Sequence, residues 1–125
     1  MYEEVHLEEV SEIMDETIHA MKTIVKKKSF TYKSLSNEDK EIIFGTSKML
    51  VKLRNELYMN LLDTFKGQTV TIGVSITNPP EGSIGEWLMN HITKTAIASY
   101  IVPILLLEGY ASLVNPNEKG KIKFD

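Results

Sequence analysis

The sequence predicts a single α+β domain that is predominantly helical, with two long amphipathic helices, a third helical region, one main strand and a minor tail strand. Apolar residues recur at helical spacing over residues 4–27 and again over residues 36–66. Apolar and small polar residues instead alternate over residues 68–77, QTVTIGVSIT, and over residues 121–125, KIKFD. A chain of 125 residues with 42% hydrophobic composition suits one domain, residues 1–125, with its own core.

The first predicted helix covers residues 4–27. Acidic residues fill its first half, and Lys22, Lys26 and Lys27 lie in its last part with Lys28 directly after it, the order that the helix macrodipole favours. We interpret this pattern as a solvated face, and an acidic docking surface for a cationic partner is the alternative. The apolar stripe consists of Val10, Ile13, Met14, Ile18, Met21, Ile24 and Val25.

The second predicted helix begins at Ser36, whose hydroxyl can cap it, and ends before Gly67. Residues 29–35 between the two helices form either a connector or a short strand. Two long amphipathic helices joined by a short connector most simply make an antiparallel pair. The stripe of the second helix runs through Ile42, Ile43, Thr46, Met49, Leu50, Leu53, Leu57, Leu61, Leu62 and Phe65.

The strand predicted at residues 68–77 has no hairpin partner next to it in the sequence. A lone strand is not stable, so its backbone must pair with a remote part of the chain or with a second copy. The tail strand at residues 121–125 can serve in either way. We therefore expect an oligomer interface formed by Val70, Ile72, Val74, Ile76, Ile122 and Phe124.

Residues 78–85 predict an exposed loop and residues 86–99 a third helix, which Pro103 limits or kinks. The run at residues 101–107 is almost wholly apolar, and residues 96–114 approach the roughly 20 residues that cross a bilayer. Pro103, Glu108 and Gly109 interrupt this stretch, so a buried helix is favoured and contact with a membrane is not expected.

Composition argues against several function classes. The formal charge of −3 and the single arginine, Arg54, give no basic footprint for nucleic acid. The absence of cysteine removes disulfides, thiol nucleophiles and thiolate metal sites, and fits a reducing interior. The acidic beginning of the chain does not resemble a secretory signal. We expect a cytoplasmic protein, or a virion protein if it derives from a phage.

Two histidines are candidates for a chemical role. Glu16-x-x-His19 has the spacing of half a di-iron site, but one copy is present and His19 falls on the polar flank with Asp15. His91, beside Trp87 in the sequence, could act as a general base, but no nucleophile elbow, Walker loop or clustered acid pair accompanies it. We therefore predict no enzymatic activity, no metal and no cofactor.

The leading hypothesis is a self-associating structural or assembly protein that forms a homo-oligomer and contacts another protein. A small cysteine-free, lysine-rich chain with long helices, a lone strand and a short tail strand is similar to the small head–tail connector and tail-assembly proteins of tailed bacteriophages. The resemblance implies that residues 68–77 and 121–125 join subunits and that residues 78–85 face a partner ring or the lumen.

The alternative is a small inhibitor or a ligand-sequestering protein with a pocket near residues 82–87. Backbone N–H groups at the start of the third helix could hold an anion there, and Trp87 could anchor a partner. The loop residues predicted to contact a partner or a ligand are Pro79, Pro80, Gly82, Ser83, Gly85 and Trp87.

Overall fold

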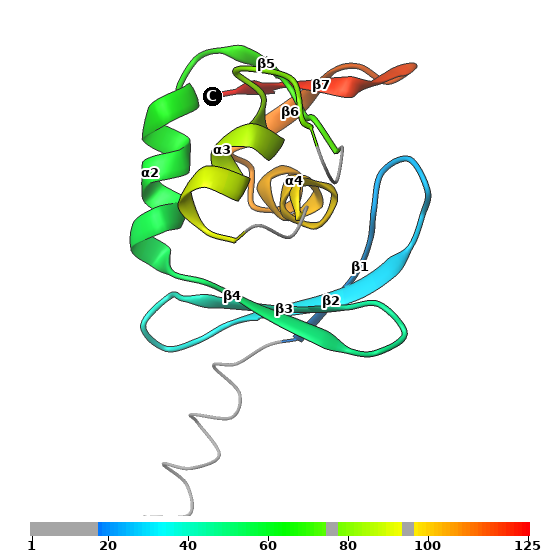
Figure 1. Cartoon of the computed structure of the whole chain (residues 1–125), viewed down its shortest axis with the longest axis vertical. Coiled ribbons are helices and arrows are strands. Elements are labelled where there is room, and N and C mark those ends of the chain that lie inside the picture. Colours follow the sequence, from blue (N-terminus) through cyan, green and yellow to red (C-terminus); the bar gives the residue numbers. More distant parts are fainter. Residues whose placement is uncertain (1–17, 75–77, 94–96) are drawn as a thin grey trace, which may run out of the picture.

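The computed structural model describes residues 18–74, 78–93 and 97–125. They form three layers, in which helices lie between two antiparallel sheets (Figure 1). The N-terminal sheet has strand order β1-β2-β3-β4 and the C-terminal sheet has order β5-β7-β6. The elements are β1 (Ile18–Lys22), β2 (Ser29–Ser34), β3 (Lys40–Phe44), β4 (Met49–Leu53), α2 (Asn55–Phe65), β5 (Thr69–Thr71), α3 (Ile84–His91), α4 (Ala98–Leu107), β6 (Ala111–Asn115) and β7 (Glu118–Phe124).

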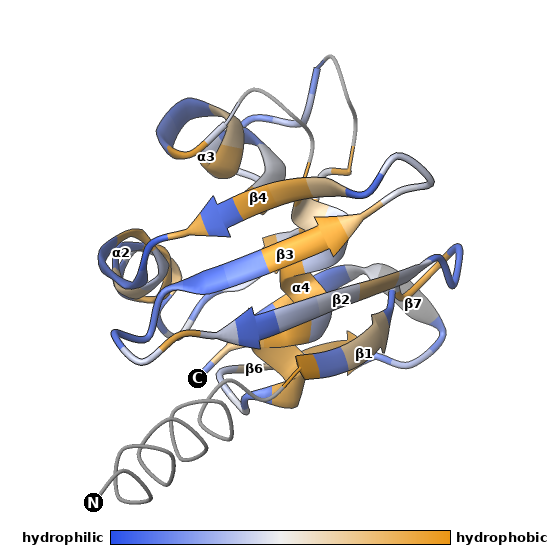
Figure 2. Cartoon of the chain, turned by 90° about the horizontal axis from the view of Figure 1, so that it is seen from below, coloured by the Kyte–Doolittle hydropathy of each residue, from blue (hydrophilic) through white to orange (hydrophobic). Residues whose placement is uncertain are grey.

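The prediction of a predominantly helical fold is wrong, because the N-terminal half of the described chain is a four-stranded antiparallel meander. Each strand pairs with the next along the chain, and side chains alternate between an inner face toward α4 and an outer face. Phe30, Tyr32, Ile42 and Phe44 point inward and are buried. The outer face is not covered by any described part of the chain (Figure 2).

The first long helix was predicted at residues 4–27, and its described part is instead β1 and a turn. Residues 18–22 alternate in burial, with His19 and Met21 inward and Ile18, Ala20 and Lys22 outward. Over so short a segment, apolar residues at three- and four-residue steps do not distinguish a helix from a strand. The antiparallel pairing with β2 makes this segment a strand. The rest of this predicted helix lies outside the described residues.

The second long helix was predicted at residues 36–66, and only α2 is helical there. Gly45 and Lys48 both adopt positive φ, which turns the chain between β3 and β4. Asp39, at the start of the predicted helix, instead lies in a turn, and its Oδ1 accepts a hydrogen bond of 2.8 Å from the backbone N of Asn55. A side chain distant in sequence thus caps α2, whose own N-cap residue supplies no side-chain cap.

The third predicted helical region forms two helices, α3 and α4, in place of one helix at residues 86–99. The apolar run at 101–107 lies in α4, between the sheets (Figure 1). Ile101, Val102 and Pro103 point in directions about 100° apart around this helix, and all three are buried because the helix lies between the two sheets. No helix in the described ranges is long and apolar enough to cross a membrane.

The two strands expected at residues 68–77 and 121–125 have counterparts in β5 and β7, which pair with each other within the chain. Val70 lies opposite Ile122 in this pairing, and β7 is also paired with β6. β5 is only three residues long, and Gly73 then adopts positive φ, which carries the chain away from the sheet. The C-terminal sheet therefore takes its middle strand from the end of the sequence.

Candidate ligand-binding site

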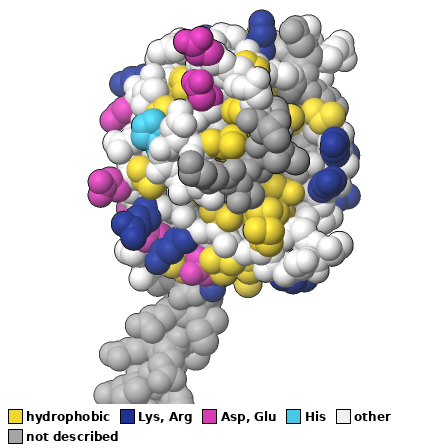
Figure 3. All heavy atoms as spheres, viewed as in Figure 1, with side chains coloured by type: hydrophobic (Ala, Val, Ile, Leu, Met, Phe, Trp, Pro, Cys, Tyr) yellow, Lys and Arg dark blue, Asp and Glu magenta, His cyan; other side chains and the backbone are white. Residues whose placement is uncertain are grey.

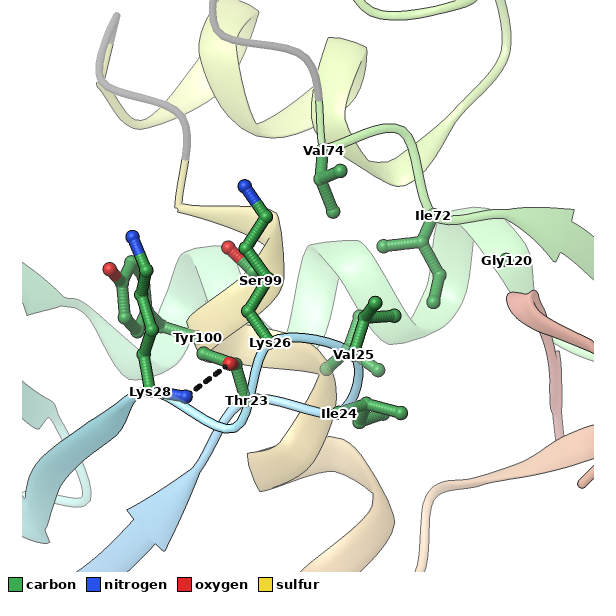
Figure 4. A pocket seen from close by; sticks show the side chains of 11 residues that line it. Thr23, Ile24, Val25, Lys26, Lys28, Ile72, Val74, Ser99, Tyr100 and Gly120 are labelled. Atoms are coloured by element: carbon green, nitrogen blue, oxygen red, sulfur yellow. Dashed lines mark hydrogen bonds between the residues drawn. The ribbon is translucent and has the colours of Figure 1, made fainter.

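A cavity of about 380 Å³ lies where the β1–β2 turn approaches the first turn of α4 and the segment after β5 (Figure 4). Its volume is within the range of roughly 300–1,000 Å³ that is typical of small-molecule sites. Figure 3 shows hydrophobic side chains gathered on one face of the molecule, with lysine or arginine side chains at the rim. The cavity is lined by Thr23, Ile24, Val25, Lys26, Lys28, Ile72, Val74, Ser99, Tyr100, Val102 and Gly120.

The β1–β2 turn is held closed by Thr23. Its backbone N donates to the carbonyl of Lys28 at 2.9 Å, and its Oγ1 accepts from the backbone N of Lys28, also at 2.9 Å (Figure 4). Lys27 adopts positive φ at the tip of the turn. Because Thr23 is buried and bonds through both groups, the turn holds Lys26 and Lys28 at the cavity.

The walls of the cavity belong to the packed core. The Tyr100 ring stacks on Phe44 with centroids 4.2 Å apart and meets the edge of Phe30 at 5.3 Å. On the opposite side, the backbone N of Ile72 donates to the carbonyl of Gly120 at 2.9 Å, which ties the end of β5 to β7. The site is therefore built from elements that are already fixed by their own packing.

The cavity lining combines an apolar body with positive charge. Val25, Ile72 and Val74 point toward the same space, and the side chains of Lys26 and Lys28 extend beside Ser99 and Tyr100 (Figure 4). Among the described lining residues there is no aspartate or glutamate. This lining suits a ligand with an apolar body and an anionic end, because the ammonium groups can pair with the anion while the floor covers the apolar part.

A second polar group of residues lies away from the cavity, at the C-terminal end of α4. Glu108 accepts hydrogen bonds from the hydroxyls of Tyr58 at 2.8 Å and Tyr32 at 3.2 Å, and its carboxylate lies 3.4 Å from Lys40 Nζ. The same ammonium lies 4.4 Å from the centroid of the Tyr58 ring. We call these four residues the Glu108 cluster; it joins β2, β3 and α2 to the end of α4.

The Glu108 cluster is a structural tie. Burial, and then the negative charge of Glu108, raise the pKa of both Tyr32 and Tyr58 above the ordinary tyrosine value, so both hydroxyls stay neutral donors. No described buried side-chain nitrogen or oxygen lacks a hydrogen-bond partner. Its effect is to hold the N-terminal sheet to the helical layer.

The loop predicted to bind a partner or an anion uses its donors internally. Ser83 is buried, and its Oγ accepts from the backbone N of Glu86 at 3.1 Å, while Glu86 Oε1 accepts from the backbone N of Gly82 at 3.0 Å. This arrangement is a close variant of the capping box. The Glu86 carboxylate lies at the start of the helix, where an anionic ligand was predicted. The lining of the cavity includes none of the six predicted loop residues, Pro79, Pro80, Gly82, Ser83, Gly85 and Trp87.

Gly85 has a packing role. Its backbone N donates to the carbonyl of Ile72 at 2.8 Å, and a Cβ at this position would overlap the carbonyl oxygen of Gly73. Trp87 stacks on His91 with ring centroids 4.2 Å apart, and His91 Nδ1 lies 2.8 Å from the carbonyl oxygen of Trp87. That contact requires a proton on Nδ1, so the His91 ring is oriented by its own helix.

The residues predicted at an oligomer interface are mostly inside the chain's own core. Val70, Ile72, Ile122 and Phe124 are buried, whereas Val74 is 56% exposed and lines the cavity. Ile76 lies outside the described residues. The structure thus brings Ile72 and Val74 to the cavity, and it places Val70, Ile122 and Phe124 in the core between the C-terminal sheet and the helices.

No group of three or more histidine, aspartate or glutamate side chains that could hold a metal occurs in residues 18–74, 78–93 and 97–125. The Glu16-x-x-His19 pair falls partly outside these ranges. His19 stacks on Tyr32 at 4.8 Å between centroids, on the inner side of the N-terminal sheet. Comparison of the chain with protein-family models, curated proteins and solved structures found no match.

Sequence reasoning missed the lysine pair at the cavity because it placed Lys26 and Lys28 at the end of a helix. Residues 23–28, TIVKKK, contain no Gly, Pro, Asn, Asp or Ser of the kind that usually marks a turn before a strand, so the sequence carried no local signal for it. Thr23 and Tyr100 carried no signal of their own, since their roles depend on contacts with distant residues.

Proposed function

We propose that this chain is a non-enzymatic binding protein that takes a small amphiphilic anion, such as a medium-chain carboxylate, into the cavity between the β1–β2 turn and α4. The observation that carries the proposal is an apolar cavity of about 380 Å³ with Lys26 and Lys28 in its lining. Burial of an alkyl chain contributes about 0.8 kcal/mol for each CH₂ group removed from water. The ammonium groups then select for the negative end.

The test is calorimetric titration of the full chain with octanoate, octan-1-ol and octylamine, which share the alkyl chain and differ in charge. Octanoate is expected to bind at least tenfold more tightly than octanol, and octylamine not to bind. The double variant Lys26→Gln/Lys28→Gln should abolish this preference, whereas Ser99→Phe should block both octanoate and octan-1-ol by filling the cavity.

The matched control is Lys27→Gln/Lys66→Gln, which removes the same total charge from two exposed lysines outside the cavity lining. It should bind octanoate like the unmodified chain. Equal affinity for octanoate and octylamine, absence of octanoate binding, or an equal loss in both double variants would each refute the proposal.

The predicted role as a self-associating structural protein of phage type, with itself and another protein as partners, stays a prediction. Four of the residues expected at its interface are buried within the chain, so an assembly that leaves this core intact would have to use other surfaces. The cavity has a defined shape and charge, and we therefore place ligand binding first.

A further inference from the structure

The outer face of the N-terminal sheet carries a row of three apolar residues and one threonine across its four strands. Ala20, Thr31, Ile43 and Leu50 are successive register partners on this face. Leu50 is 54% exposed, and Ile18, beside the row, is 67% exposed. A sheet face with such a row normally packs against another layer, and Figure 2 looks directly onto it.

The row borders a hollow. A depression of about 240 Å³ opens over β1, β2 and β3, with Ala20, Thr31 and Ile43 in its lining and Lys22 and Lys48 beside them. The outward-facing strand positions carry three lysines, Lys22, Lys33 and Lys52, and one acid, Glu41. Two of these lysines already have acidic neighbours: Lys33 Nζ lies 3.7 Å from Glu41, and Lys52 Nζ lies 3.8 Å from Asp39. With Lys22 and Lys48 included, the face keeps an excess of positive charge beside its mostly apolar middle.

Residues 1–17 have the complementary character. Seven of the 17 acidic residues lie in this segment and none of the 14 lysines and arginines, so its formal charge is −7, while residues 18–125 carry +4. Leu7, Val10, Ile13 and Met14 recur at the spacing of one helical stripe. A helix of 17 residues would be about 25 Å long, enough to cross four strands, whose outermost axes are about 14 Å apart.

We propose that residues 1–17 of the same chain dock on the outer face of its N-terminal sheet, with the apolar stripe over the Ala20–Leu50 row and the acidic residues against the flanking lysines. The segment joins the sheet directly at Ile18, the first residue of the edge strand β1. Its local concentration at this face is then in the millimolar range typical of short connections, well above that of a second copy at micromolar protein.

The absence of cysteine makes crosslinking a direct test. Full-length chains with Ile13→Cys and Leu50→Cys are treated with a short bifunctional maleimide and resolved by mass. The expected product is an internally linked monomer that forms about tenfold faster than in the control pair Ile13→Cys/Met59→Cys. Met59 is 39% exposed on α2, away from this face.

Two further variants sharpen the result. Glu12→Cys/Leu50→Cys tests the stripe and should link more slowly than Ile13→Cys/Leu50→Cys, because Glu12 falls on the polar side. Adding Lys33→Glu and Lys52→Glu to the latter pair should slow its linking, with circular dichroism confirming the fold. The proposal would be overturned by equal linking rates for Ile13→Cys/Leu50→Cys and Ile13→Cys/Met59→Cys, or by a product that is mainly a linked dimer. A linking rate that does not change with Lys33→Glu and Lys52→Glu would also overturn it.

Discussion

Replacing Glu108 by alanine removes the acceptor at the centre of the Glu108 cluster. Lys40, which is 6% exposed, would lose the carboxylate 3.4 Å from its ammonium, and the hydroxyls of Tyr32 and Tyr58 would lose their shared partner. Breaking a buried ion pair from one side costs about 3–5 kcal/mol. The Glu108 side chain is 22% exposed, so water reaches the site and we expect about 3 kcal/mol.

The assay is urea denaturation followed by far-ultraviolet circular dichroism. With a denaturant slope of about 2 kcal/mol per molar, the midpoint should fall by about 1.5 M. Thermal unfolding should shift down by about 9–15 °C for a chain of this size. Asp63→Ala, which removes an exposed acid from α2, is the matched control and should change stability by less than about 0.5 kcal/mol.

The double variant Lys40→Met/Glu108→Met tests whether Glu108→Ala loses stability because Lys40 is left buried without its charge partner or because packing is lost. It should recover much of the stability, because neither charge is then left buried alone. The explanation fails if Glu108→Ala costs less than about 1 kcal/mol, or if the double variant is no more stable than Glu108→Ala.

Gly85→Ala should lower stability by more than about 2 kcal/mol in urea denaturation, because its Cβ would overlap the Gly73 carbonyl oxygen, whereas Gly120→Ala, with open space, should be near neutral. Asp39→Ala should cost about 1 kcal/mol by the same assay through loss of the distant cap on α2, and no change would contradict that role. Above pH 10, folded Tyr58 keeps a proton that the unfolded chain releases, so stability should fall as pH rises; Tyr58→Phe should flatten this decline, and equal slopes would exclude it.

Local signals predicted those parts of the fold that depend on few partners. The apolar run at residues 101–107 was interpreted as a buried helix, and it lies in α4 between the two sheets. The alternating KIKFD segment similarly matches the end of β7, because Ile122 and Phe124 share one buried side.

In the N-terminal half, tertiary contacts determined whether the chain forms helices or strands. Residues such as Ile42, Ile43 and Leu50 satisfy a helical stripe as well as a strand pattern when only a few turns are considered, and β-propensity depends on neighbouring strands. Successive hairpins resolved the ambiguity, since each strand gains its partner only when the next one folds back.

The candidate site likewise combines features that local sequence patterns predict with features that depend on tertiary contacts. The sequence alone predicts apolar side chains at alternate positions of residues 68–77, and Ile72 and Val74 of that set line the cavity. Only the tertiary structure placed Lys26 and Lys28 opposite them, by closing the β1–β2 turn through Thr23. The cavity is lined by residues from four separate parts of the chain, 23–28, 72–74, 99–102 and 120, and local periodicity carries no information about contacts between such distant segments.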